Sequence, residues 1–163
     1  MKRLICLILL FSFLLCGCSS MGERIKEPVT FYYIQENYQK EMGNVIAPEV
    51  REAAGHRYDL PYLLALYSMG PSGNGLVSPF PVNTRILPVE HSEDGLVLSV
   101  LDEIQDMTDA QYTLASSCLA MTCLEMIDVE QITVICGDRS VTIKADTLLI
   151  GSTHNVITLE ERK

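Results

Sequence analysis

The side chains of this 163-residue chain that could act as nucleophiles, bases or metal ligands are few and lie apart in the sequence. The three histidines, His56, His91 and His154, are each isolated in an expected loop or strand end, so none has a partner on a helix that would mark a metal site. Ser72, in the turn of residues 70–73, comes nearest to a serine nucleophile on a tight turn, but it lacks the Gly-x-Ser-x-Gly pattern. We therefore predict that the protein is not an enzyme and uses no cofactor or metal.

The six cysteines fall into two groups. Three of them lie within the first 18 residues, and the other three are Cys118, Cys123 and Cys136. An odd number is poor material for a disulfide framework, and the spacing matches no zinc pattern. Cys118 and Cys123 would lie about 140° apart around a helix, so they cannot pair within it. We expect these three cysteines to be free thiols that pack as small hydrophobic side chains.

Cys18 is the cysteine for which the sequence predicts a definite chemistry. The chain opens with the basic pair Lys2 and Arg3, and an apolar run of about a dozen residues follows, which is too short to cross a ~30 Å hydrocarbon core. The next stretch, Leu15-Cys16-Gly17-Cys18, resembles the bacterial lipobox, with a leucine three residues before the cysteine and a small residue directly before it. The resemblance implies diacylglycerol transfer to the sulfur of Cys18 and cleavage before it. The protein is therefore expected to be extracytoplasmic and anchored to the cell membrane; an ordinary signal peptide with a coincidental cysteine is the alternative.

Length and charge limit what the rest of the chain can be. Removing 17 of the 163 residues leaves 146, enough for one domain with a hydrophobic core. We expect a signal peptide at 1–17, a tether at 18–27, one domain at 28–150 and a tail at 151–163. The net charge moves from −9 to −11 because two basic residues leave with the signal. Such an acidic chain does not bind nucleic acid by phosphate neutralisation, and its scattered acids, Glu49 among them, are expected to be solvated.

Hydrophobic patterns predict a domain of alternating strands and helices. Asp59 is placed as the N-cap of one helix, and Thr108 with Gln111 forms a capping box that opens a second, longer one. Turns at 92–95 and 137–140 join four strands into two hairpins. The expected helices are 59–69 and 109–127, and the expected strands are 29–34, 44–51, 85–89, 96–101, 131–136 and 141–144. This order predicts an α/β (α+β) two-layer sandwich, with two helices on one face of a mixed β-sheet of about five to six strands.

The helix expected at 109–127 is apolar nearly all round. A single sheet covers only one stripe of a helix, so the other side needs the first helix, the tail or another protein. Leu114, Met121 and Leu124 are therefore the candidate interaction residues.

The glycine- and proline-rich stretch 70–81 is expected to redirect the chain after the first helix, with ligand capture by its backbone amides as the alternative. It is no phosphate-binding loop, because no Gly-Lys-Ser/Thr follows. Tyrosines could stack on a peptide or glycan, or they could be half-buried core residues. An envelope ligand-binding lipoprotein is accordingly the alternative function. The tyrosines concerned are Tyr32, Tyr33, Tyr38, Tyr58 and Tyr62.

Several of these stretches together resemble the GerM domain of sporulation and germination lipoproteins. The resemblance covers about residues 28–144 and departs from the family pattern at 98–100 and at 115–119. The matching stretches are the strand 29–33, the Pro48-Glu49 strand 46–51, the leucine-rich helix before Gly70-Pro71, the run Gly75-Leu76-Val77-Ser78 with Pro81 after it, and the Asp94-Gly95-Leu96 turn.

The resemblance implies a non-catalytic domain, similar to ring-building modules of the channel apparatus between mother cell and forespore. Such a domain acts through protein contacts in the extracytoplasmic space. The expected partners are the cell membrane, through the lipid on Cys18, and envelope or sporulation proteins, with oligomer formation as one form of assembly and with no nucleic acid.

Overall fold

The computed structural model describes residues 26–38, 44–91, 95–101, 104 and 106–147. The expected signal peptide, the lipidation site Cys18, nearly all of the tether and the tail at 151–163 lie outside these residues. The assignments made for those segments therefore stay predictions.

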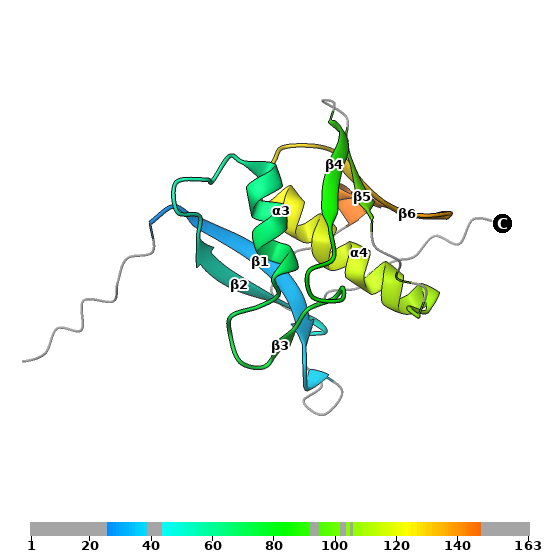
Figure 1. The fold of residues 1–163 in the computed structure, drawn as a ribbon, viewed down its shortest axis with the longest axis horizontal. Coiled ribbons are helices and arrows are strands. Elements are labelled where there is room, and N and C mark those ends of the chain that lie inside the picture. Colours follow the sequence, from blue (N-terminus) through cyan, green and yellow to red (C-terminus); the bar gives the residue numbers. More distant parts are fainter. Residues whose placement is uncertain (1–25, 39–43, 92–94, 102–103, 105, 148–163) are drawn as a thin grey trace, which may run out of the picture.

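The first sheet has three strands in the order β2-β1-β3 (Figure 1). Strand β1 (Pro28–Gln35) pairs antiparallel with β2 (Ile46–Glu52) from Pro28 to Ile34, and with β3 (Leu76–Val77) only at Ile34 and Gln35. Most of the second edge of β1 therefore has no neighbouring strand. The two-residue strand β3 was not expected, because two residues within a turn-rich stretch are too few to show an alternating pattern.

The second sheet has four strands in the order β4-β5-β6-β7. Strands β4 (Ile86–His91) and β5 (Gly95–Val100) form one antiparallel pair, and β6 (Gln131–Cys136) and β7 (Arg139–Lys144) form another. Both pairings were predicted from the turns. Strands β5 and β6 run parallel, and the connection between them contains the long helix.

Both helices begin at the caps that the sequence predicts. Helix α3 (Leu60–Ser68) starts after Asp59, whose carboxylate accepts from the Tyr62 amide, and α4 (Asp109–Leu124) starts at the Thr108 capping box. A short 3-10 helix, η1 (Ala145–Thr147), follows β7. The α+β class with two helices is thus confirmed, whereas the described strands form two sheets with seven strands in place of one mixed sheet with five or six.

Helix α4 packs against β1 of the first sheet and against β6 and β7 of the second. Every side chain from residue 115 to residue 123 is buried. The apolar character all round this helix is therefore accounted for within the domain, because two sheets cover two of its faces. Met121 is buried, with 8% of its surface exposed, and Leu114 and Leu124 are half-buried. Their role in an interaction stays a prediction.

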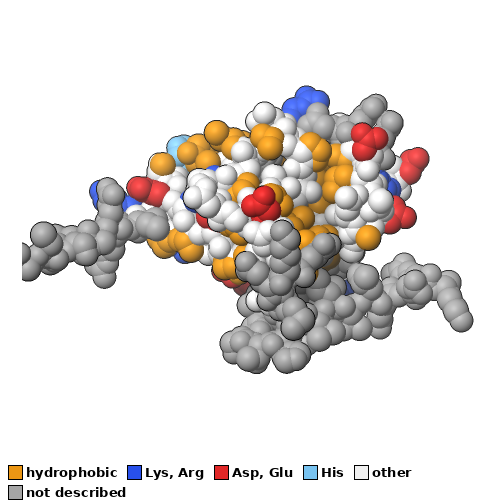
Figure 2. Space-filling model, turned by 90° about the horizontal axis from the view of Figure 1, so that it is seen from below, with side chains coloured by type: hydrophobic (Ala, Val, Ile, Leu, Met, Phe, Trp, Pro, Cys, Tyr) orange, Lys and Arg blue, Asp and Glu red, His pale blue; other side chains and the backbone are white. Residues whose placement is uncertain are grey.

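Large apolar side chains that remain exposed are spread over several elements. In Figure 2, apolar side chains lie in separate groups on the visible face, with charged side chains among and around them. The exposed ones among the described residues are Val50, Tyr58, Met69, Val77, Val82, Leu87, Val89 and Leu101.

Candidate functional site

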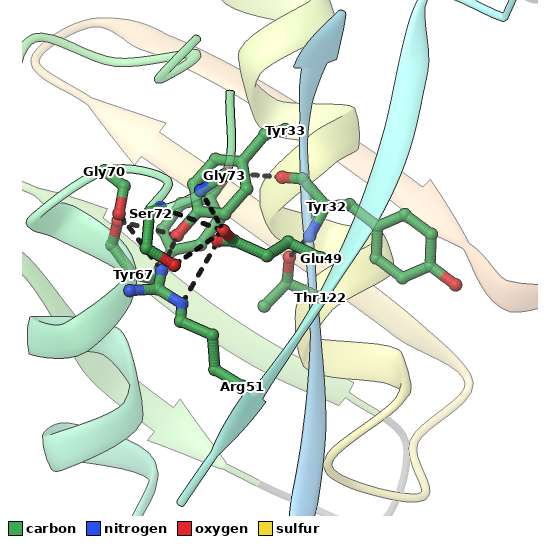
Figure 3. A network of polar contacts seen from close by, with 9 residues as sticks. All are labelled: Tyr32, Tyr33, Glu49, Arg51, Tyr67, Gly70, Ser72, Gly73 and Thr122. Carbon is green, nitrogen blue, oxygen red and sulfur yellow. Dashed lines mark hydrogen bonds and ion pairs between the residues drawn. The ribbon is translucent and has the colours of Figure 1, made fainter. Parts of the chain in front are cut away.

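A polar network links strand β2 to the loop that follows α3, and Figure 3 shows its members. Residues 49 and 51 alternate with exposed Pro48 and Val50, so the side chains of Glu49 and Arg51 lie on the same face of β2. The Glu49 Oε1 atom accepts three hydrogen bonds, from the Ser72 amide at 2.9 Å, the Ser72 hydroxyl at 2.8 Å and the Gly73 amide at 2.6 Å. One carboxylate thus fixes the loop to the strand.

Arg51 joins this carboxylate to the aromatic core. Its Nε lies 3.2 Å from Glu49 Oε2, and the two side chains are only 15% and 10% exposed. Its guanidinium also donates to the Tyr33 hydroxyl and, at 3.1 Å, to the Gly70 carbonyl, and it lies 4.6 Å from the centre of the Phe31 ring. Gly70 follows the end of the helix and has a φ of 85°, a conformation that favours glycine. This conformation accompanies the hydrogen bond from Arg51 to the Gly70 carbonyl.

Side-chain hydroxyls cover the edge of β1 that no strand pairs with. The Tyr32 amide donates to Thr122 Oγ1 at 2.9 Å, and the Tyr32 carbonyl accepts from the Tyr67 hydroxyl at 3.2 Å. Tyr33, on the other face of β1 (Figure 3), donates to the Tyr67 carbonyl, and the rings of Tyr33 and Tyr67 stack 5.1 Å apart. The helices α3 and α4 therefore supply the partners that a neighbouring strand would supply in a longer sheet.

Burial raises the pKa values of the tyrosines in this network. It raises the pKa of Tyr32 to about 12, and the hydrogen bond to Glu125 and the charge of Glu125 add to this effect. Burial also raises the pKa of Tyr33 to about 12, although the charge of Arg51 opposes the rise, and it raises the pKa of Tyr67 well above its usual range. The tyrosines in the network therefore act as hydrogen-bond donors, and none is set up as a phenolate base.

A second arginine holds the segment before α4 in a similar way. Arg139, the first residue of β7, donates to the carbonyl of Met107 at 2.8 Å and to that of Ile104 at 2.7 Å. Its guanidinium lies 4.9 Å from the centre of the Tyr112 ring, and the Tyr112 hydroxyl donates to the Val134 carbonyl at 3.0 Å. These contacts hold the start of α4 and the segment before it against the second sheet.

The histidines and Ser72, which were considered as bases, nucleophiles or metal ligands, do not lie close together among the described residues. The His56 Nδ1 atom lies 3.4 Å from Asp59 Oδ2, and its ring stacks on Tyr62 at 4.1 Å, at the start of α3. His91 is exposed at the end of β4, and His154 lies outside the described residues. Ser72 uses both its amide and its hydroxyl to hold Glu49. Within the described part of the chain, no three histidine, cysteine, aspartate or glutamate residues form a group that could hold a metal ion.

The cysteine prediction is confirmed where it can be checked. Cys118, Cys123 and Cys136 form no disulfide with one another; the first two are buried, and Cys136 is half-buried against the core. Burial raises the pKa of both helix thiols to about 12, so they are protonated and unreactive at neutral pH.

The expectation that the Glu49 side chain is solvated is wrong, because that side chain is only 10% exposed. Glu49 is the main residue of the network that sequence reasoning missed. Acids are mostly solvated, and nothing local shows that a loop over 20 residues away wraps the carboxylate. One signal was present: opposite charges two residues apart on a strand, Glu49 and Arg51, share a face. Of the tyrosines considered for stacking, Tyr32 and Tyr33 are buried, whereas Tyr58 is 92% exposed.

The fold and the network define a small α+β domain whose buried polar side chains join a loop, a strand and two helices. No helix among the described residues is long and apolar enough to cross a membrane. No model of a known protein family matches the sequence, and no curated protein matches it either.

Two solved structures are similar to the chain. One contains the tandem GerMN domains of the sporulation protein GerM from Bacillus subtilis, with 18% identity and a TM-score of 0.46 over 69% of this chain. The chain spans only 39% of that structure's length. The other is a Clostridium perfringens protein provisionally assigned as a lipoprotein, with 14% identity and a TM-score of 0.44, covering 73% of this chain and 89% of the other. GerM is also the family that the sequence motifs resemble.

Proposed function

We propose that this protein is a non-catalytic lipoprotein of the GerM type, anchored on the outside of the cell membrane through Cys18, where it assembles with envelope or sporulation proteins. The proposal combines the lipobox-like stretch at residues 15–18 with the GerM-like motifs of the domain.

The observation that carries the non-catalytic part is how the polar groups of the loop after α3 are used. The Ser72 and Gly73 amides, which could otherwise bind an anionic ligand, hold the Glu49 carboxylate, and Arg51 faces that same carboxylate. These groups stabilise the junction of loop and sheet and are not directed at an open site. A domain whose charged groups are engaged in this way is suited to present a rigid surface to a partner.

The anchoring part is tested by changing Cys18 to Ala in the full chain and following incorporation of a labelled fatty acid. We expect the label to be lost and the protein to leave the membrane fraction or to stay uncleaved. Cys16→Ala is the matched control, because it removes a cysteine two residues away while keeping Leu15, Gly17 and Cys18. Equal labelling of the Cys18→Ala variant and the wild type would overturn the anchor.

The assembly part is tested by purifying the wild-type lipoprotein from detergent-solubilised envelope and identifying what accompanies it. We expect the same envelope proteins to be recovered repeatedly, and to be missing when Cys18→Ala misplaces the chain. A correctly anchored protein that is recovered without any partner, or a purified protein that instead binds muropeptides, would contradict assembly as the function.

A further inference from the structure

Among the described residues, one face of the second sheet lies outside the hydrophobic core. Its inner face enters the core through Ile86, Leu98, Val134 and their neighbours, which pack with both helices. Its outer face contributes nothing to that core, and no described helix or strand packs on it. The outer residues, read across the sheet from the pairing registers, are Leu87 on β4, Val97 and Ser99 on β5, Thr133 and Ile135 on β6, and Ser140 and Thr142 on β7.

This outer face carries no charge in its middle, although the whole chain has a net charge of −9. Leu87 is 48% exposed. Leu101 follows β5, lies on the same face as Ser99 by the alternation of the strand, and is 44% exposed. Thr133 and Thr142 bond to each other across β6 and β7 with a hydroxyl distance of 3.0 Å, so the two hydroxyls form a satisfied polar pair. Such a surface can be removed from water at little polar cost.

The charges stand at the corners of the face in an alternating order. Glu90 on β4 and Lys144 on β7 lie at the same end of the sheet but on opposite edges, because Glu90 pairs with Val97 and Lys144 pairs with Gln131. Both residues are exposed. Arg85 and Asp138 lie likewise on opposite edges at the other end, just before β4 and just before β7.

We propose that the outer face of the second sheet binds the same face of a second copy of this chain. In a face-to-face pair whose two-fold axis runs parallel to the strands between β5 and β6, β4 of one copy lies over β7 of the other. Glu90 then comes next to Lys144 of the second copy, and the symmetry repeats this contact, so acidic corners meet basic corners. The uncharged middles stack as in a β-sandwich, about 10 Å apart.

The structure of β4 favours contact between the faces of two copies over hydrogen bonding between their β4 edges. Pro88 removes a backbone donor, and a bulge between Pro88 and Glu90 breaks the register, so the free edge of β4 is a poor template for another strand. Four strands of about six residues offer only about 400 Å² per copy, roughly half of what a stable complex buries on each partner. The pair is therefore a weak one, and confinement on a membrane would promote it by raising the local concentration.

The experiment places Thr133→Cys, close to the proposed axis, in the full chain and cross-links isolated membranes with a short bismaleimide. The proposal expects a cross-linked pair that the chain with Thr133 intact, which still carries Cys136, does not give. Glu90→Lys and Lys144→Glu should each weaken dimerisation about tenfold, because symmetry turns both contacts into like-charge pairs. The double change E90K/K144E should restore the wild-type yield. Leu87→Lys should also reduce the yield, whereas Val50→Lys, equally exposed on the first sheet, should not.

Absence of a cross-linked pair, equal loss with Val50→Lys, or failure of the charge swap to restore the yield would overturn the proposal. Far-ultraviolet circular dichroism of each purified variant separates loss of contact from loss of fold, and the swap remains informative if one single variant folds poorly. The inference deepens the assembly function proposed above. Fatty-acid labelling of the same membranes reports the anchor separately, and cross-linking of the Cys18→Ala chain at high concentration tests the pair without it.

Discussion

Replacing Glu49 with alanine should destabilise the domain, because the side chain holds a loop and faces a largely buried guanidinium. The change removes the acceptor of three hydrogen bonds and leaves Arg51 facing Phe31 and Tyr33 without its counter-charge. Removing one partner of a fully buried ion pair costs about 3–5 kcal/mol. Ser72 and Gly73 are exposed, so water can replace part of what they lose, and we expect a loss of about 2 kcal/mol.

Urea unfolding of a soluble chain that starts after Cys18 measures this loss as a lower midpoint at an unchanged slope. Glu52→Ala is the matched control, because Glu52 is an exposed acid on the same strand; it should change the free energy of unfolding by less than about 0.5 kcal/mol. Combining Glu49→Ala with Arg51→Ala should cost clearly less than the sum of the two single changes. If Glu49→Ala behaved like Glu52→Ala, or if the two changes were additive, the network would not be the link between loop and sheet that we describe.

Three further predictions concern the core. Thr122→Val should cost about 1–3 kcal/mol in urea unfolding, because it leaves the buried Tyr32 amide without an acceptor; Thr122→Ser should keep most of the stability, and an equal loss in both variants would point to packing instead. Because folding raises the pKa of the Cys118 and Cys123 thiols from 9.0 to about 12, their contribution to stability is complete below pH 9 and is lost as the pH rises toward 12. Changing both cysteines to alanine should make the decline above pH 9 shallower, and an unchanged decline would assign it to other groups. Thiol titration should find about three free groups in the denatured chain, while in the native protein Cys136 reacts first; fast native labelling of Cys118 or Cys123 would contradict their burial.

The sequence was sufficient for features that depend on neighbouring residues. Both helices begin at Asp59 and Thr108 because a cap needs only a side chain and an amide two or three residues later. The hairpins of the second sheet follow from short turns between apolar strands. The lipobox-like stretch before Cys18 is equally local, and the anchor that it implies stays a prediction.

Only the tertiary structure decided which residues far apart in the chain meet. Helix α4 looked like a helix in need of a partner because its pattern does not say how many sheets cover it, and here β1 packs on one side while β6 and β7 pack on another. Glu49 looked like a surface acid because its partners, Ser72 and Gly73, are 23 and 24 residues away. Thr122 likewise satisfies an amide 90 residues distant. The strand or helix in which a residue lies determines where its hydrogen-bonding groups point. Which partner they meet depends on how the sheets and helices pack, because that packing is set by the whole core.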